Sequence, residues 1–126
     1  LIIAPSNPML SIAPILAVPG IGDLLQQSKC TVAMSPIVDG MALKGPLAKL
    51  MEEFGLEVSV VGWCRYMQGM YPGNIDYWVF DERDRWRETE LRALVPNPLF
   101  FESIINGPAH AGALIDQVIT EVASYV

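Results

Sequence analysis

Short apolar runs alternate along the chain with segments that have the periodicity of amphipathic helices. Such runs predict buried strands where they are mostly apolar and end at a proline, a turn former or a charged residue. They occupy Leu1–Ala4, Thr31–Met34, Tyr77–Phe80 and Leu99–Glu102. Because helical segments separate the runs, this order predicts an α/β fold with a parallel sheet covered by helices. No repeat or linker interrupts it, so residues 1–126 are predicted to form one domain.

The clearest helix in the sequence is Pro46–Phe54. Proline suits the first position of a helix, and Gly55 suits the position just past its end. Apolar residues at i, i+3, i+4 and i+7 predict one buried face, formed by Leu47, Leu50, Met51 and Phe54. Further helices are predicted from a cap at Ser11 to Leu16, over Ile21–Gln27 and Glu82–Leu94, and around Leu114, Ile115, Val118, Ile119 and Val122.

One segment of the chain leaves two interpretations open. Over Glu57–Tyr66 the valines favour a strand, whereas Ser59 could cap a helix that runs through Met67. Elsewhere we expect a loop over Ser35–Gly45 and a turn over Tyr71–Asn74.

The apolar content agrees with a soluble α/β fold. Apolar residues make up 52% of the chain, above the roughly 45–50% usual in soluble domains, and buried parallel strands account for the excess. The most apolar stretch, Leu1–Leu25, contains Asp23 and is broken by prolines, so it does not suit a membrane span of about 20 residues. No basic segment precedes it, which argues against a signal peptide. We therefore expect no membrane partner.

The charge balance of the chain is acidic. Eight lysines and arginines stand against fourteen aspartates and glutamates, a formal net charge of −6. Nucleic-acid-binding proteins usually carry a basic patch, and because none is visible in the sequence we expect no nucleic-acid partner. Anionic small ligands stay compatible with this charge, since backbone N–H groups can hold phosphate whatever the net charge.

Few residues suit metal binding or nucleophilic catalysis. Cys30 and Cys64 lie in apolar segments and are predicted to be buried free thiols in a reducing cytosol, which gives a cytoplasmic location. With His110 as the single histidine, in a predicted loop, neither a His/Cys zinc site nor a Ser–His pair has enough members. A solvated helix start is preferred over a metal site for Asp81, Glu82 and Asp84. Core or edge packing is preferred over flavin stacking for Trp63, Trp78 and Trp86.

Two loops are predicted to lie at the carboxyl ends of strands, where open parallel sheets bind ligands. The first loop runs from Ala4 to Pro8 and leads into a helix. It offers hydroxyl and amide groups on Ser6, Asn7 and Ser11, and its prolines stiffen the backbone and lower the entropic cost of presenting them. The alternative is a plain turn, because proline, asparagine and serine are common turn formers.

The second loop, Ser35–Pro46, also leaves a predicted strand and enters a predicted helix. Lys44 and Gly45 lie at the amino end of that helix, where free N–H groups and the helix dipole favour an anion. Gly40 and Gly45 allow the backbone to approach a ligand closely. The alternative is a solvated surface lysine beside a helix entry. This is not a Walker loop, because the lysine precedes the last glycine and no Gly-Lys-Ser/Thr follows.

The residues of these loops are similar to a run found in CofD transferases. The similarity rests on Pro5-Ser6-Asn7-Pro8 followed by Ser11-Ile12, then Ser35-Pro36-Ile37, then Ala42-Leu43-Lys44-Gly45-Pro46. Tyr66 and the segment Val79–Asp84 also resemble that family. Each motif is short, but together and at these spacings they are specific. The resemblance fades after about Leu94, and Asp39 stands where relatives usually carry a small residue.

The resemblance implies the C-terminal half of a CofD-type 2-phospho-L-lactate transferase, an enzyme of coenzyme F-420 biosynthesis. Its implied fold is a three-layer, Rossmann-like (doubly wound) and mostly parallel α/β sheet. The family moves a phospholactyl-type group from a guanosine diphosphate-linked donor, lactyl-2-diphospho-5′-guanosine or an enolpyruvyl analogue, to the deazaflavin FO, and it releases GMP. Mg²⁺ is the implied cofactor, with its ligands expected upstream of this sequence. The implied partners are the guanylylated donor and FO, and a homodimer is left open.

On this resemblance, both loops line the nucleotide or phosphate side of the cleft. The residues concerned are Ser6, Asn7, Ser11, Ser35, Lys44, Gly45 and Pro46. No metal ligand and no catalytic residue is assigned here, because the family's glycine-rich loop and early acidic residues lie upstream. We therefore expect the chain to be inactive alone. Two alternatives stay open: a nucleotide-binding regulatory protein of the related gluconeogenesis-factor branch, and a degenerate fragment that keeps only the core.

Overall fold

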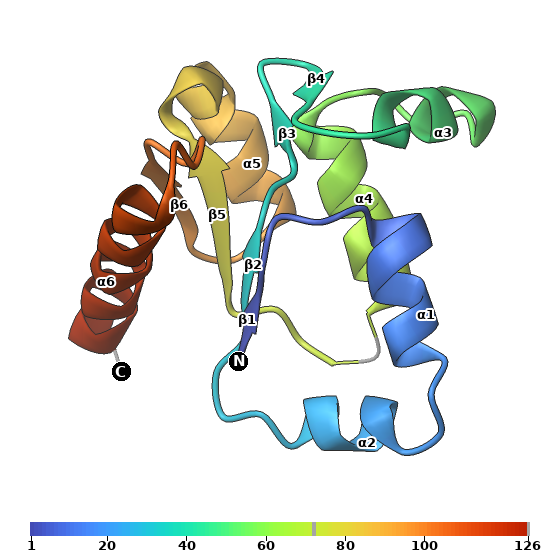
Figure 1. Cartoon of the computed structure of the whole chain (residues 1–126), viewed down its shortest axis with the longest axis horizontal. Helices are drawn as coiled ribbons and strands as arrows, with labels where there is room; N and C mark the ends of the chain where they lie inside the picture. Colours follow the sequence, from blue (N-terminus) through green and yellow to red (C-terminus); the bar gives the residue numbers. More distant parts are fainter. Residues whose placement is uncertain (72, 126) are drawn as a thin grey trace.

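Four strands form a parallel sheet at the centre of the chain (Figure 1). The structure, a computed structural model, describes residues 1–71 and 73–125. The strand order is β1-β2-β5-β6, with bounds Ile2–Ile3, Val32–Met34, Tyr77–Asp81 and Pro98–Phe101, and each neighbouring pair is parallel. The predicted parallel sheet is confirmed, and every strand end lies within one residue of its prediction. The predicted turn Tyr71–Asn74 includes Pro72, which lies outside the described residues.

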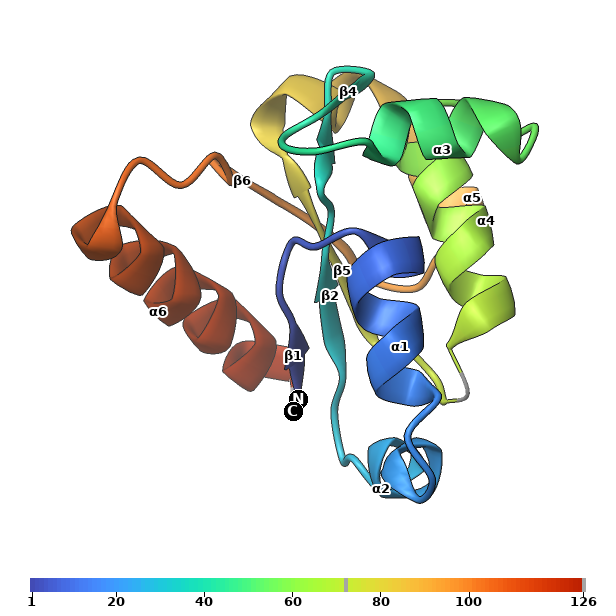
Figure 2. The same cartoon turned by 45° about the vertical axis from the view of Figure 1, so that its right-hand side comes forward.

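Helices cover both faces of this sheet, which gives three layers (Figure 2). The helical elements are η1 (Pro8–Ile12), α1 (Ala13–Leu16), α2 (Ile21–Gln26), α3 (Leu47–Glu53), α4 (Val60–Met70), η2 (Glu82–Arg87), α5 (Glu88–Leu94) and α6 (Pro108–Tyr125). α1, α4 and α5 lie on one face and α6 lies on the other. Because the strand order advances in one direction and such crossovers are right-handed, the connecting helices share a face. The α/β, Rossmann-like fold is confirmed.

α4 resolves the segment that the sequence left open. Ser59 has extended backbone, and its Oγ accepts a hydrogen bond from the N–H of Gly62 at 3.1 Å. Such an N-cap satisfies a donor that the first turn of a helix leaves free. The helix interpretation of Glu57–Tyr66 is confirmed. Of the three valines that favoured a strand, Val58 precedes the helix, and Val60 and Val61 bury their side chains from its first turn.

The first helical segment begins earlier than predicted. Its N-cap is Asn7, whose Oδ1 accepts from the N–H groups of Met9 at 2.9 Å and Leu10 at 3.1 Å. The chain then forms a turn of π-helix, η1, which continues into α1. The predicted cap at Ser11 is wrong because Pro8 follows Asn7 directly, in the position where a helix tolerates a missing N–H.

The segment predicted as an irregular loop, Ser35–Gly45, contains a β-hairpin. Its strands β3 (Ile37–Val38) and β4 (Met41–Ala42) pair antiparallel. The turn residues Asp39 and Gly40 have φ of 50° and 73°, and Asp-Gly is a sequence that two-residue hairpin turns favour. The loop prediction is therefore wrong, and the Asp-Gly pair is the signal that identifies the hairpin.

Two predicted helices differ in detail from those in the structure. α3 buries Leu47 and Met51, as its periodicity predicts, but Phe54 lies past its last turn and is 65% exposed. Gly55 follows with φ of 70°, as expected for a helix end. The helix predicted over Glu82–Leu94 divides into a 3₁₀-helix, η2, and α5.

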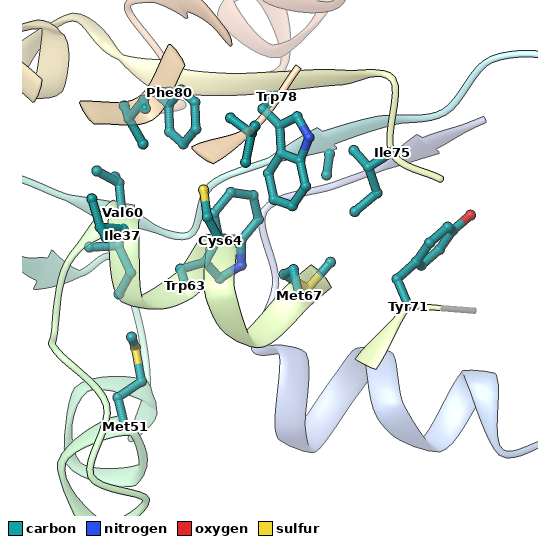
Figure 3. Packing of buried hydrophobic residues seen from close by; sticks show 14 of the residues in the cluster. Ile37, Met51, Val60, Trp63, Cys64, Met67, Tyr71, Ile75, Trp78 and Phe80 are labelled. Carbon is teal, nitrogen blue, oxygen red and sulfur yellow. The ribbon is translucent and has the colours of Figure 1, made fainter. Parts of the chain in front are cut away.

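Two hydrophobic clusters join the layers, one on each face of the sheet. In the larger cluster, Trp63 of α4 meets the ring of Trp78 at 5.3 Å and that of Phe80 at 6.1 Å, both edge-on (Figure 3). On the opposite face, Val79 belongs to a cluster with Leu114 and other apolar residues of α6. β5 is thus buried on both sides, as expected of a central strand in a covered parallel sheet.

None of the helices in the described part of the chain combines the length and the apolar character that a membrane span requires.

Candidate functional site

The two predicted ligand loops leave the carboxyl end of the sheet on the same face. Residues 4–7 join β1 to η1, and residues 43–46 join β4 to α3. In both views the two segments lie at the end to which the strand arrows point, and both pass toward the face covered by α1 and α4 (Figures 1 and 2). β1 and β2 are neighbours, so the chain leaves the sheet at adjacent points after each of them, and residues 43–46 follow β2 by way of the β3–β4 hairpin. Both loops therefore lie toward the carboxyl end of the sheet and on the same face.

Only one of the two polar atoms of the Asn7 side-chain amide makes hydrogen bonds within the described residues. Its Oδ1 caps η1, whereas its Nδ2 is buried and has no hydrogen-bond partner among residues 1–71 and 73–125. The two N–H groups that Oδ1 accepts fix the orientation of the amide. A buried donor without a partner costs about 1–3 kcal/mol, so a ligand oxygen that reached Nδ2 would stabilise this loop.

The three serines of the predicted site differ in what their surroundings allow. Ser6 and Ser11 are partly buried on either side of the Asn7 cap. Ser35 is 2% exposed, and its hydroxyl donates to the carbonyl oxygen of Ile37 at 2.9 Å and accepts from the N–H of Ile37 at 3.0 Å. The Ser35 hydroxyl therefore shapes the entry to the hairpin and is not presented to a ligand.

Lys44, Gly45 and Pro46 form an exposed segment before α3. Gly45 has φ of 69°, a left-handed conformation that residues with side chains adopt with strain. Pro46 accepts the N–H of Leu50 on its carbonyl oxygen at 3.0 Å, which ties this segment to the helix. α3 has only seven residues, so we assign no anion site to its amino end. The Lys44 ammonium is the main positive group that the segment offers to an anion.

Two aspartates predicted to lie at a solvated helix start do lie at the start of η2, where Asp81 is the N-cap, but both are buried, so the predicted solvation is wrong. Asp81 is 3% exposed, and its Oδ2 accepts from the N–H and Oγ–H of Ser103 at 2.9 and 3.0 Å. Asp84 is 2% exposed, and both of its carboxylate oxygens lie 3.2 Å from the backbone nitrogen of Asp39. Glu82 alone is exposed as expected. The partners lie 22 and 45 residues away in the chain, so nothing near these aspartates signals the contacts.

Mg²⁺, which the resemblance implies, does not fit the residues at this end of the sheet. Within the described ranges, no three Asp, Glu, His or Cys side chains gather closely enough to hold a metal ion. The carboxylates of Asp81 and Asp84 accept hydrogen bonds from the chain itself. No step of the chemistry is therefore assigned to a metal held by these residues.

Burial raises the pKa of Asp84 above its usual value. The N–H of Asp39 opposes this rise, and the negative charges of Asp81 and Asp39 add to it. At pH values between the pKa of Asp84 in the unfolded chain and its higher pKa in the folded chain, the folded chain binds more protons. The contribution of Asp84 to the free energy of unfolding therefore falls as the pH rises through this range.

The variant Asp84→Asn lacks that titration, while its side-chain oxygen can still accept the Asp39 N–H. We expect the free energy of unfolding of the variant, minus that of the wild type, to increase as the pH is raised from about 4 to about 7. Urea unfolding followed by circular dichroism at several pH values measures this difference. A difference that stays constant with pH would contradict the burial argument.

Two cavities lie away from the predicted ligand loops. One, of about 380 Å³, opens at the amino ends of β5 and β6 between Tyr71, Ile75 and Asn97. The other, of about 460 Å³, lies along α4 beside Leu56 and Tyr66. Neither includes a residue of the predicted site.

The cysteines, the histidine and the tryptophans lie outside the two predicted ligand loops. Cys30 and Cys64 are free, as predicted, but only Cys64 is fully buried, and burial raises the pKa of its thiol. His110 lies in α6 and not in a loop, and its Nδ1 accepts from the N–H of Asn106 at 3.2 Å. Trp86 is 71% exposed, unlike the buried Trp63 and Trp78.

Comparison with known proteins gives a consistent set of matches. The model of a family described as 2-phospho-L-lactate transferase CofD matches residues 1–95. The 2-phospho-L-lactate transferase of Methanosarcina barkeri is 47% identical over 93 residues, which is 74% of this chain and 28% of that protein. The transferase of Methanocaldococcus jannaschii is 40% identical over 100 residues, 78% of this chain and 30% of that protein.

A third relative extends beyond the segment that the family model matches. The 2-phospho-L-lactate transferase of Methanospirillum hungatei is 31% identical over 121 residues, 96% of this chain and 37% of that protein. The chain thus spans between 28% and 37% of the length of these three relatives. With a family model over residues 1–95 and relatives at these identities, the chain belongs to the CofD family.

Proposed function

We propose that this chain is part of a transferase that moves a phospholactyl-type group from a guanosine diphosphate-linked donor to the deazaflavin FO and releases GMP. Membership of the CofD family supports the proposal, as do the relatives that carry the name 2-phospho-L-lactate transferase. Those names favour the transferase over a nucleotide-binding regulatory protein. A reaction on soluble substrates in the cytoplasm also agrees with two free cysteines.

Within this function, the chain supplies one wall of the nucleotide cleft. Phosphoryl transfer depends mainly on positioning and on neutralising charge, so a protein nucleophile is not required. The Lys44 ammonium is suited to neutralise phosphate oxygens, because it is exposed beside a glycine that lets the backbone approach. The Nδ2 of Asn7 is buried without a partner, so a phosphate or ribose oxygen would have to enter the loop to accept its hydrogen bond. The observation that carries the proposal is that both loops leave the same end of the sheet on the same face.

Binding of GDP to the chain tests this role, because GDP carries the nucleotide part of the donor. We expect Lys44→Ala to weaken GDP binding about tenfold or more, since one cation–phosphate contact contributes on the order of 1.5–3 kcal/mol. The measurement is isothermal titration calorimetry at low ionic strength, where such contacts are least screened.

Lys49→Ala is the matched control for this experiment. Lys49 lies in α3, its side chain is 77% exposed, and it pairs with Glu53 at 3.7 Å away from the loop. Its removal is expected to leave GDP affinity within about twofold, because exposed helix pairs contribute roughly 0.3–0.5 kcal/mol and touch no ligand. Equal effects of both variants, or no heat from the wild type at millimolar GDP, would contradict the proposed role.

Transfer activity is expected to be absent from the isolated chain. The relatives are about three times as long, and the family's glycine-rich loop and acidic metal ligands are expected outside this sequence. Incubation with FO, the guanylylated donor and Mg²⁺, followed by chromatography of the deazaflavin, should therefore give no product. Product formed by the chain alone would show that these residues contain the whole active site.

A further inference from the structure

The β3–β4 hairpin forms the entry to the Lys44 segment. Its turn is residues 39–40, and its second strand ends at Ala42, two residues before Lys44. The N–H of Leu43 donates to the carbonyl oxygen of Pro36 at 3.0 Å, which extends the pairing to the base of the hairpin. The tilt of the hairpin therefore determines where the Lys44 segment starts.

The side chain of Asp84 joins the tip of this hairpin to the neighbouring strand connection. Asp84 lies in η2, directly after β5, and its two oxygens accept the N–H of Asp39. The hairpin has two residues in each strand, and a hairpin this short is marginal without outside contacts. β3 is buried through Ile37 and Val38, whereas Met41 of β4 is 63% exposed. The contact from Asp84 is thus a restraint on the exposed turn of the hairpin.

The chemistry of this restraint indicates a role beyond stability. A buried carboxylate loses solvation, and a neutral acceptor would bind the same N–H without that loss. The burial of Asp84 is consistent with a geometric requirement, because charge-assisted hydrogen bonds are stronger and more directional than neutral ones. Its partner Asp39 has a left-handed backbone that orients the N–H toward η2.

We propose that Asp84 is a positioning residue, which holds the hairpin through the Asp39 N–H so that Lys44 faces the phosphate groups of the bound nucleotide. The proposal rests on the proposed function, since it assigns a purpose to the orientation of Lys44. Asp84 itself touches no substrate. It acts through the hairpin.

A double-mutant cycle on GDP affinity tests this coupling. Asp84→Ala removes the acceptor and is expected to weaken GDP binding about tenfold in the wild-type background. In a Lys44→Ala background it should have almost no further effect, because the side chain that it positions is gone. Asp84→Asn keeps an acceptor oxygen but loses the charge, so its GDP affinity is expected to lie between those of the wild type and Asp84→Ala. A loss that persists in the Lys44→Ala background would overturn the proposal.

Ser103→Ala is the control for general destabilisation. It removes a buried hydrogen bond to Asp81 at the same end of the sheet without touching the hairpin. Urea unfolding should show a loss of stability for Ser103→Ala, while GDP affinity stays within about twofold. If Ser103→Ala and Asp84→Ala weaken GDP binding equally, Asp84 is only structural and the proposal is wrong.

Amide signals from nuclear magnetic resonance separate this proposal from the proposed function. If the wild type binds no GDP, the proposed function fails, but the free chain still reports on the hairpin. Asp84→Ala should then shift and broaden the amide signals of Lys44 and Gly45, while that of Val118 in α6 stays unchanged. Unshifted Lys44 and Gly45 signals would show that Asp84 does not position the segment.

Discussion

Replacing Gly62 by alanine is expected to destabilise the chain by about 3 kcal/mol or more, a large part of the roughly 5–15 kcal/mol that stabilises a small domain. A Cβ at this position would lie 1.9 Å from the carbonyl oxygen of Glu57 and 2.9 Å from its carbonyl carbon. Both atoms belong to backbone, which cannot rotate away as a side chain can. The Gly62 N–H also donates to the Ser59 cap, so a shift that relieved the clash would stretch this hydrogen bond.

Gly69→Ala is a matched control on the same helix. Gly69 also lies in α4, but it is exposed, and a Cβ built there meets no atom within 4 Å. Alanine should therefore stabilise the chain by about 0.5–1 kcal/mol, the usual gain from replacing glycine inside a helix. The two midpoints of urea unfolding should move in opposite directions. Two shifts of the same sign would show that the close approach at Gly62 is not what constrains α4.

The sheet was predictable from the sequence because its strands are short, apolar and separated by helices. Each strand carries its own signal, so no knowledge of distant contacts is needed. The segment 57–66 was ambiguous because its valines have β propensity, while Ser59 is a good cap. Tertiary structure decides between them: α4 buries Val60, Val61, Trp63 and Cys64 on the face that meets the sheet, which a strand with alternating faces could not do.

The candidate site was predictable only as a pair of loops. The position of ligands in parallel sheets identifies which strand ends to inspect, and the structure places both loops at one end on one face. The roles of individual residues depend on contacts that the local sequence does not show. The Ser35 hydroxyl is used in hydrogen bonds to the backbone of Ile37 at the start of the hairpin. Asn7, and not Ser11, is the N-cap of the first helical segment.

The buried aspartates show why polar residues are hard to place from sequence. An acidic cluster after a strand usually lies in solvent at a helix start, and Glu82 does so. Asp81 and Asp84 are instead buried by partners at Ser103 and Asp39, far along the chain in either direction. Only the assembled fold brings each donor to its carboxylate.

Replacing Trp63 by alanine is expected to cost about 3–5 kcal/mol, because it empties the centre of the larger hydrophobic cluster. Trp63 is 1% exposed and packs edge-on against Trp78 and Phe80. It joins α4 to β5, so its loss separates one helical layer from the sheet. Urea unfolding followed by circular dichroism measures the change in the free energy of unfolding.

Trp63→Phe separates packing from the polarity of the indole. The Nε1 of Trp63 is buried and has no hydrogen-bond partner within the described residues. Phenylalanine keeps an aromatic ring and removes this donor, whose burial without a partner costs about 1–3 kcal/mol. We therefore expect Trp63→Phe to recover most of the stability that Trp63→Ala loses.

Trp86→Ala is the control for the size of the side chain removed. Trp86 is 71% exposed, and the guanidinium of Arg87 lies over its ring, 4.9 Å from the ring centroid. An exposed cation–π contact contributes about 0.5–1 kcal/mol, so this variant should lose no more than that. A Trp86→Ala variant as unstable as Trp63→Ala would mean that the buried cluster is not the main source of stability. The packing of α4 on β5 would then not depend on Trp63.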